Sequence, residues 1–164
     1  MAGVAVFFLC TALSAASKRP TSAWNFYHFD GQTFVAGPPV GEGAFLAVRD
    51  QTVPVLLTLK ETGPDAVPLP KGTGAIAGIC YIQTAGGKLA TGSGYLPCPR
   101  IPITISSSSG RPVATVQTDE NGYFQAVLAA GVYRVGTAPQ ARDVTVEVAK
   151  TTLVPLRTGK RMVD

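Results

Sequence analysis

The stretch from Thr118 to Tyr133 reads TDENGYFQAVLAAGVY, and it holds two turn signals that are each followed by an alternating run. Asn121 and Gly122 form the first signal, because both residues tolerate a positive φ, and Gly131 forms the second. Alternation of apolar with polar residues is typical of strands that bury one face. We therefore expect a β-meander here, with Asn121, Gly122 and Gly131 as its structural turns.

Turn-forming residues recur through the rest of the chain. Its 164 residues include 18 glycines and 13 prolines, which break up helices and suit short strands joined by turns. After residue 16, no window of about 12 residues shows a helical period with caps. Seven strands are predicted in the second half, at 75–82, 101–105, 113–118, 123–128, 133–137, 143–148 and 152–156. This spacing predicts an all-β protein containing an antiparallel β-sandwich.

The N-terminus carries an apolar run, from Val4 to Ala16. The run is shorter than the roughly 20 residues that a membrane span needs, and it ends on small residues typical of a cleavage site. We predict that residues 1–16 are a signal peptide; an N-terminal strand or buried segment is the alternative. Export would make this a secreted, periplasmic or cell-surface protein with no transmembrane span in the mature chain.

Residues 17–60 form a β-prone arm that is rich in aromatic side chains. A hairpin is predicted at Asp30-Gly31, and further strands at 44–48 and 53–59. Five aromatic side chains are too many for a solvated arm, so they either pack on the sandwich or bind a partner. An extended apolar segment can also add a strand to a neighbouring protein. The candidate partner-binding residues are Trp24, Phe26, Tyr27, Phe29 and Phe34.

The composition of residues 61–73, ETGPDAVPLPKGT, predicts a linker between the arm and the sandwich. A basic tail is predicted at 159–164. The net charge of +4 is otherwise scattered along the chain. Nucleic-acid binding needs a clustered basic surface, usually with stacking aromatics or a motif, so we expect no nucleic-acid partner.

Cysteine usage agrees with export. Removal of the leader leaves two of the three cysteines, Cys80 and Cys98. In an oxidising compartment this pair predicts a disulfide that closes a loop of about 17 residues and stabilises the fold by on the order of 3 kcal/mol. Two free, buried thiols are the alternative. Two thiols and one histidine fall short of a structural zinc site, so no metal is expected.

No motif for catalysis emerges. His28 is the only histidine, and neither G-x-S-x-G nor H-E-x-x-H occurs. The glycines at 72–78 lead into a strand, whereas a dinucleotide loop opens a helix. Asp119, Glu120 and Asn121 lack the spacing of a calcium loop, so a turn is favoured there. We expect no catalytic residue, no cofactor and no enzymatic activity.

Five blocks in order carry a family resemblance: Gly74-x-Ile76-x-Gly78, Leu96-Pro97, Thr118-Asp119-x-x-Gly122-Tyr123-Phe124, Leu128-x-x-Gly131-x-Tyr133-x-Val135 and Val144-x-Val146. Through them, residues 74–158 resemble the carboxypeptidase regulatory-like domain, a transthyretin-like (prealbumin-like) β-sandwich. That family is related in shape to the Cna B-type repeats of bacterial surface proteins. The resemblance implies a seven-stranded antiparallel Greek-key sandwich, hairpin turns at Gly122 and Gly131, and Tyr133 in the core.

Two activities of related domains do not carry over to this chain. Isopeptide-forming Cna B-type domains need a core-facing strand lysine, and none is found. Ureide-hydrolysing relatives use histidines and a C-terminal motif that this chain lacks.

We expect a non-catalytic, exported structural or interaction module of an extracytoplasmic assembly, such as a surface filament, an envelope complex or an accessory subunit. It would dock through its arm and its sheet edges onto a protein partner or another copy of itself. The alternative is a carbohydrate- or small-ligand-binding module that contacts its glycan or ligand through Tyr95, Tyr123 and Trp24.

Overall fold

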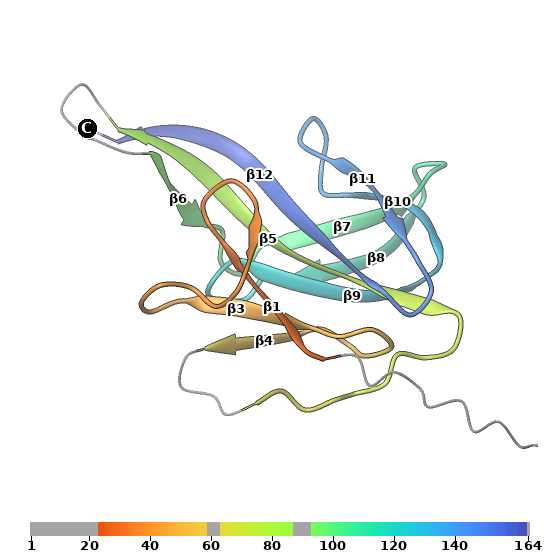
Figure 1. Cartoon of the computed structure of the whole chain (residues 1–164). Coiled ribbons are helices and arrows are strands. Elements are labelled where there is room, and N and C mark those ends of the chain that lie inside the picture. The colour runs from red at the N-terminus through yellow and green to blue at the C-terminus, as the bar shows by residue number, and fades with distance from the viewer. Residues whose placement is uncertain (1–22, 59–62, 87–92, 164) are drawn as a thin grey trace, which may run out of the picture.

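The computed structural model describes residues 23–58, 63–86 and 93–163, so the predicted signal peptide lies outside the described residues. These ranges contain no helix, and thus no helical membrane span. The all-β prediction is confirmed (Figure 1). The strands are β1 (Asn25–Phe29), β2 (Phe34–Ala36), β3 (Ala44–Val48), β4 (Val55–Thr58), β5 (Thr73–Gly86), β6 (Ser93–Pro97), β7 (Pro102–Ser107), β8 (Pro112–Gln117), β9 (Tyr123–Ala129), β10 (Gly131–Val135), β11 (Arg142–Val146) and β12 (Thr151–Val163).

The strands form three sheets. The N-terminal sheet has the order β2-β1-β3-β4, and the far sheet has the order β11-β10-β7-β8. Between them lies the central sheet, β12-β5-β6, in which β9 also pairs with β5. The central and far sheets enclose the main core, where Ile76 of β5 meets Ile105 of β7, Val135 of β10 and Val146 of β11. Removing these aliphatic side chains from water is the main force that holds the two sheets together.

The central strand β5 is covered on both faces. Ala75, Ile76, Ala77, Ile79 and Cys80 are each 0% exposed. The even-numbered side chains enter the core shared with the far sheet, whereas Ala77 and Ile79 pack against the N-terminal sheet. A strand buried on both sides carries apolar residues at successive positions rather than at alternate ones. The arm therefore forms a third layer of the same molecule.

The N-terminal sheet is built from the predicted hairpin and the two predicted strands. Gly31 turns the chain between β1 and β2 with a φ of +102°. The Asp30 carboxylate accepts hydrogen bonds from the backbone N–H groups of Thr33 and Gln32, both at 2.8 Å. These bonds, that from Thr33 first, lower the pKa of Asp30. An Asx-type turn of this kind fixes the hairpin locally.

The described part of the predicted linker is attached to the N-terminal sheet. Val53 N–H donates to the carbonyl of Val67 at 2.8 Å, and Leu69 N–H donates to the carbonyl of Gln51 at 2.9 Å. These bonds hold the segment after residue 62 alongside the β3–β4 connection until β5 begins.

The β-meander prediction is wrong. β8 and β10 belong to the far sheet and β9 to the central sheet, so the turns at Gly122 and Gly131 carry the chain between sheets and are not hairpins. Gly122 is required there: its φ is +78°, and a Cβ would lie 2.7 Å from the carbonyl oxygen of Cys80. Gly131 takes no positive φ. Half-buried Tyr133 packs against the main core, and its hydroxyl donates to the Ala129 carbonyl at 2.9 Å.

The seven-stranded antiparallel arrangement also needs correction. The chain from Thr73 onward has an eighth strand, β6, and β12 pairs with β5 in parallel from Thr151 to Val163. Residues 159–163 of the predicted basic tail are thus the end of β12 rather than a separate tail. β12 contains Pro155, which has no N–H to donate, as an edge position allows. Figure 1 shows β5, β6 and β12 projecting beyond the other sheets.

Candidate functional site

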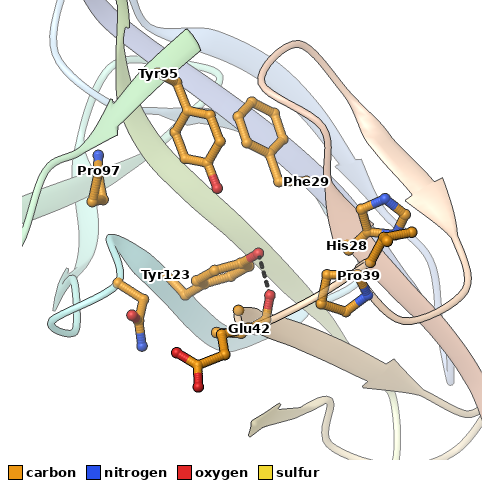
Figure 2. Close-up of a pocket in the computed structure, with 11 residues that line it drawn as sticks. His28, Phe29, Pro39, Glu42, Tyr95, Pro97 and Tyr123 are labelled. Carbon is orange, nitrogen blue, oxygen red and sulfur yellow. Dashed lines mark hydrogen bonds between the residues drawn. The ribbon is translucent and has the colours of Figure 1, made fainter. Parts of the chain in front are cut away.

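A hollow opens where the N-terminal sheet meets the end of β6 and the turn before β9. Its volume is about 600 Å³, within the range of small-molecule sites. The hollow is lined by His28 and Phe29 of β1, by the loop between β2 and β3, and by Tyr95, Asn121 and Tyr123. Figure 2 shows Tyr95 and Phe29 beside each other, with Tyr123 opposite them. The hollow therefore exists only because the arm folds back onto the sandwich.

The apolar wall of this hollow is an aromatic cluster. The rings of Phe29 and Tyr95 meet edge to face, with centroids 4.9 Å apart and an interplanar angle of 82°. Tyr81 lies behind both rings, 4.6 Å from Phe29 and 6.2 Å from Tyr95. A Cβ on Gly31 would come within 3.3 Å of the Tyr95 ring. Edge-to-face packing holds these rings in fixed orientations, so the wall is rigid.

Tyr123 forms the floor, and the preceding turn sets its position. The Asp119 carboxylate accepts hydrogen bonds from the N–H groups of Asn121 and Tyr123, at 2.9 and 2.8 Å. The Tyr123 ring is 5% exposed, and its hydroxyl donates to the Ala44 carbonyl at 3.1 Å. Burial raises the pKa of both Tyr123 and Tyr95, so both phenols stay protonated at neutral pH.

Polar groups without partners surround the entrance. The side chains of Glu42 and Asn121 are exposed, and neither makes a hydrogen bond or ion pair with any described residue. His28 Nδ1 donates to the Gly37 carbonyl at 2.9 Å, because a carbonyl can only accept, and this leaves Nε2 available for a further hydrogen bond. The entrance thus offers a carboxylate, an amide and an imidazole nitrogen.

The five candidate partner-binding residues divide between the two faces of the N-terminal sheet. Tyr27, Phe29 and Phe34 pack toward the central sheet. Trp24 and Phe26 lie on the opposite face, where Phe26 meets the Phe45 ring at 5.9 Å and Trp24 lies beneath Arg49. Tyr27, Phe29 and Phe34 therefore pack within the same molecule, and partner binding by these five residues stays a prediction.

The structure brings together only two of the three residues that were predicted to contact a sugar or small ligand. Tyr95 and Tyr123 both line the hollow, whereas Trp24 lies away from it, on the other face of the N-terminal sheet. Sequence reasoning missed Glu42, because the loop between β2 and β3 has no periodic pattern. It assigned Asn121 only a role in the turn. The one signal for this loop was its glycine- and proline-rich composition.

Cys80 and Cys98 are neighbours in the main core. The β5–β6 register, which pairs Tyr81 with Pro97, places the two cysteines opposite each other, and Cys98 N–H donates to the Cys80 carbonyl at 2.9 Å. Both are free, buried thiols. Burial, and then the adjacent Cys98, raise the pKa of Cys80 to about 12. The disulfide stays a prediction that this juxtaposition makes testable.

Within the described ranges, no three histidine, cysteine, aspartate or glutamate side chains gather as a metal site would require. The ion pairs Arg100–Glu120, Arg134–Asp143 and Lys150–Glu147 are exposed, and pairs of this kind contribute little stability. The described charged groups therefore mark no second site.

Comparison with known proteins leaves the family open. No protein-family model matches the chain, and the search among curated proteins found no match. A solved structure with some likeness is GBS52, the minor pilin in the Gram-positive pathogen Streptococcus agalactiae. It is 18% identical with a TM-score of 0.41, and the match covers 80% of this chain and 66% of that one, just under two thirds of its length. A likeness at this level establishes neither a shared family nor a shared function.

Proposed function

We propose that this chain is a non-catalytic interaction module of an extracytoplasmic assembly, with a transthyretin-like sandwich as its body, and that it joins a second copy through the free edge of β9. The free edge carries this proposal. Among the described strands β9 pairs only with β5, and its seven residues, YFQAVLA, include no charge and no proline. An unblocked edge presents N–H and C=O groups that template the addition of another strand.

The other edges carry features that discourage pairing. β2 has three residues and β4 has four, β8 begins at Pro112, and β12 contains Pro155. β11 begins with the charged pair Arg142–Asp143, and β6 ends at Pro97. Short length, proline and charge are the devices by which natural sheets protect their edges. β9 has none of them.

The alternation of hydrogen bonds along the β5–β9 pair shows which backbone N–H and C=O groups of β9 do not bond to β5. Cys80 N–H bonds the Gly122 carbonyl and Ala130 N–H bonds the Gly72 carbonyl, so even-numbered residues of β9 pair with β5. The N–H and C=O groups of Gln125, Val127 and Ala129 therefore point to the free edge. The same three residues have exposed side chains, since the N-terminal sheet covers only the start of β9.

A second copy suits this edge. Because β9 is uncharged, two such strands can lie antiparallel without opposing like charges, and the pairing would cover Val127, which is 40% exposed. Two of the side chains that catalysis could use are already engaged in the fold: His28 Nδ1 donates to the Gly37 carbonyl, and the Asp119 carboxylate accepts hydrogen bonds within its own turn. These contacts support the non-catalytic part of the proposal.

The test is the oligomeric state. Size-exclusion chromatography with light scattering should show a dimer that forms as concentration rises. Val127→Lys should abolish it, because two lysines would meet across the new pair. The matched control is Val132→Lys, at a 51% exposed site on β10, a strand that is already paired on both sides. A wild-type monomer at every concentration, or equal dimerisation of both variants, would refute pairing through β9.

A further inference from the structure

We propose that the hollow between the N-terminal sheet and the turn before β9 binds a neutral pyranose sugar, with Tyr95 as the stacking ring and Glu42 and Asn121 as hydrogen-bonding groups. This site is separate from the β9 edge, and its variants touch different residues. Figure 2 shows Tyr95 and Phe29 facing Tyr123 across the open space.

A sugar first needs an aromatic ring with an exposed face on which it can stack. Phe29 and Tyr123 are each 5% exposed, so their faces are covered by neighbouring side chains. Tyr95 is half-buried, which leaves part of its ring open. Its orientation is set by the edge contacts with Phe29 and Tyr81. The electron-rich face of a ring attracts the C–H groups of a sugar, and a fixed ring loses little entropy on binding.

A sugar also needs hydrogen-bonding groups, and several polar groups around the hollow have no partner in the described protein. The Glu42 carboxylate is an acceptor, His28 Nε2 is available for a hydrogen bond, and the Asn121 amide offers both donors and an acceptor. The Tyr95 hydroxyl, whose pKa is raised further by burial, can donate and has no hydrogen-bond partner among the described residues. Donors and acceptors mixed around an apolar wall match a ligand that has one C–H face and several hydroxyl groups.

The same features exclude other small ligands. A quaternary ammonium ion needs several open aromatic faces, and here only Tyr95 has one. A phosphate or an acidic sugar would lie beside the Glu42 carboxylate, the only carboxylate that lines the hollow, and like charges repel. A neutral sugar uses both the ring and the polar groups without either penalty.

The experiment is a two-dimensional amide NMR titration of the full chain. The probes are the methyl glycosides of glucose, galactose, mannose and N-acetylglucosamine, then maltose, cellobiose and chitobiose, with tetramethylammonium chloride and inorganic phosphate as contrasts. At least one neutral sugar should give saturable shifts at Tyr95, Asn121 and Tyr123. Glu42→Gln should weaken that binding by about tenfold or more, because a hydrogen bond to a charged group is lost.

The controls keep folding and binding apart. Glu42 is exposed, so Glu42→Gln should keep the wild-type melting temperature, and Asp65→Asn, at an exposed site that does not line the hollow, should keep the wild-type affinity. Tyr95→Phe retains the ring and should bind weakly, whereas Tyr95→Ala should not bind. The proposal is overturned if no neutral sugar gives saturable shifts at these residues, if Glu42→Gln binds as the wild type does, or if only tetramethylammonium or phosphate binds.

Discussion

Replacing Ile79 by alanine tests whether the N-terminal sheet covers the central sheet. Ile79 is 0% exposed, and its side chain lies on the face of β5 that packs against the arm. Losing its outer carbons forfeits about 2.4 kcal/mol of burial free energy, and the remaining cavity adds about 1 kcal/mol or more. We expect Ile79→Ala to lower the free energy of unfolding by about 3–4 kcal/mol.

The assay is urea unfolding followed by circular dichroism, with a thermal melt alongside. A loss of that size should lower the melting temperature by about 7–14 °C for a chain of this length. Ile76→Ala removes the same atoms from the opposite face and should cost a similar amount, while Val132→Ala at an exposed site should change stability by less than about 0.5 kcal/mol. If Ile79→Ala changed stability as little as Val132→Ala while Ile76→Ala cost several kcal/mol, the N-terminal sheet would not cover the Ile79 face of β5.

Three further outcomes follow from single contacts. Tyr123→Phe leaves the Ala44 carbonyl without its donor and should cost about 1–3 kcal/mol in urea unfolding; an unchanged midpoint would contradict the hydrogen bond. Refolding from urea in oxidised glutathione, which exposes both thiols, should join Cys80 to Cys98, lower the mass by two hydrogens and raise stability by about 3 kcal/mol; thiols that stay free after such refolding would contradict that pairing. The lowered pKa of Asp30 means that its ionised form stabilises the hairpin, so this contribution is complete above the unfolded pKa and is lost as pH falls through the folded pKa. Asp30→Asn should remove that acid-dependent part of the stability curve, and a variant with the wild-type acid slope would show that the carboxylate plays no such role.

Local pattern was enough to predict most of the strands, although it missed β6. Alternation and turn residues predicted β7, β9 and β11 close to their observed positions, and Asp30-Gly31 predicted the β1–β2 hairpin. These features depend on the φ preferences of turn residues and on the two-residue period of a strand. Both are properties of neighbouring residues, so the sequence displays them directly.

Pairing between strands is a long-range property, and there the predictions failed. Nothing within residues 118–133 distinguishes a hairpin at Gly122 from a crossover, because both need a tight turn. The parallel pairing of β12 with β5 joins segments about 75 residues apart along the chain, and local spacing does not encode it. One clue was missed: β5 is apolar at successive positions, a pattern that indicates a strand covered on both faces.

The candidate site could be predicted only in part. Aromatic residues beside turns, such as Tyr95 and Tyr123, are visible in the sequence as candidate ligand contacts. Glu42 and Asn121 become binding candidates only when the arm folds back and brings the loop between β2 and β3 opposite the turn before β9. The polar half of the site is therefore a product of tertiary packing.

The most direct measurement of this folding back is a nuclear Overhauser experiment on mixed isotope-labelled and unlabelled chains. The ring of Phe29 should show strong contacts to the rings of Tyr81 and Tyr95, at centroid separations of 4.6 and 4.9 Å, and these should arise within a single chain. Contacts that appear only between labelled and unlabelled chains, or no contacts between these rings, would contradict a third layer formed by the chain's own N-terminal half.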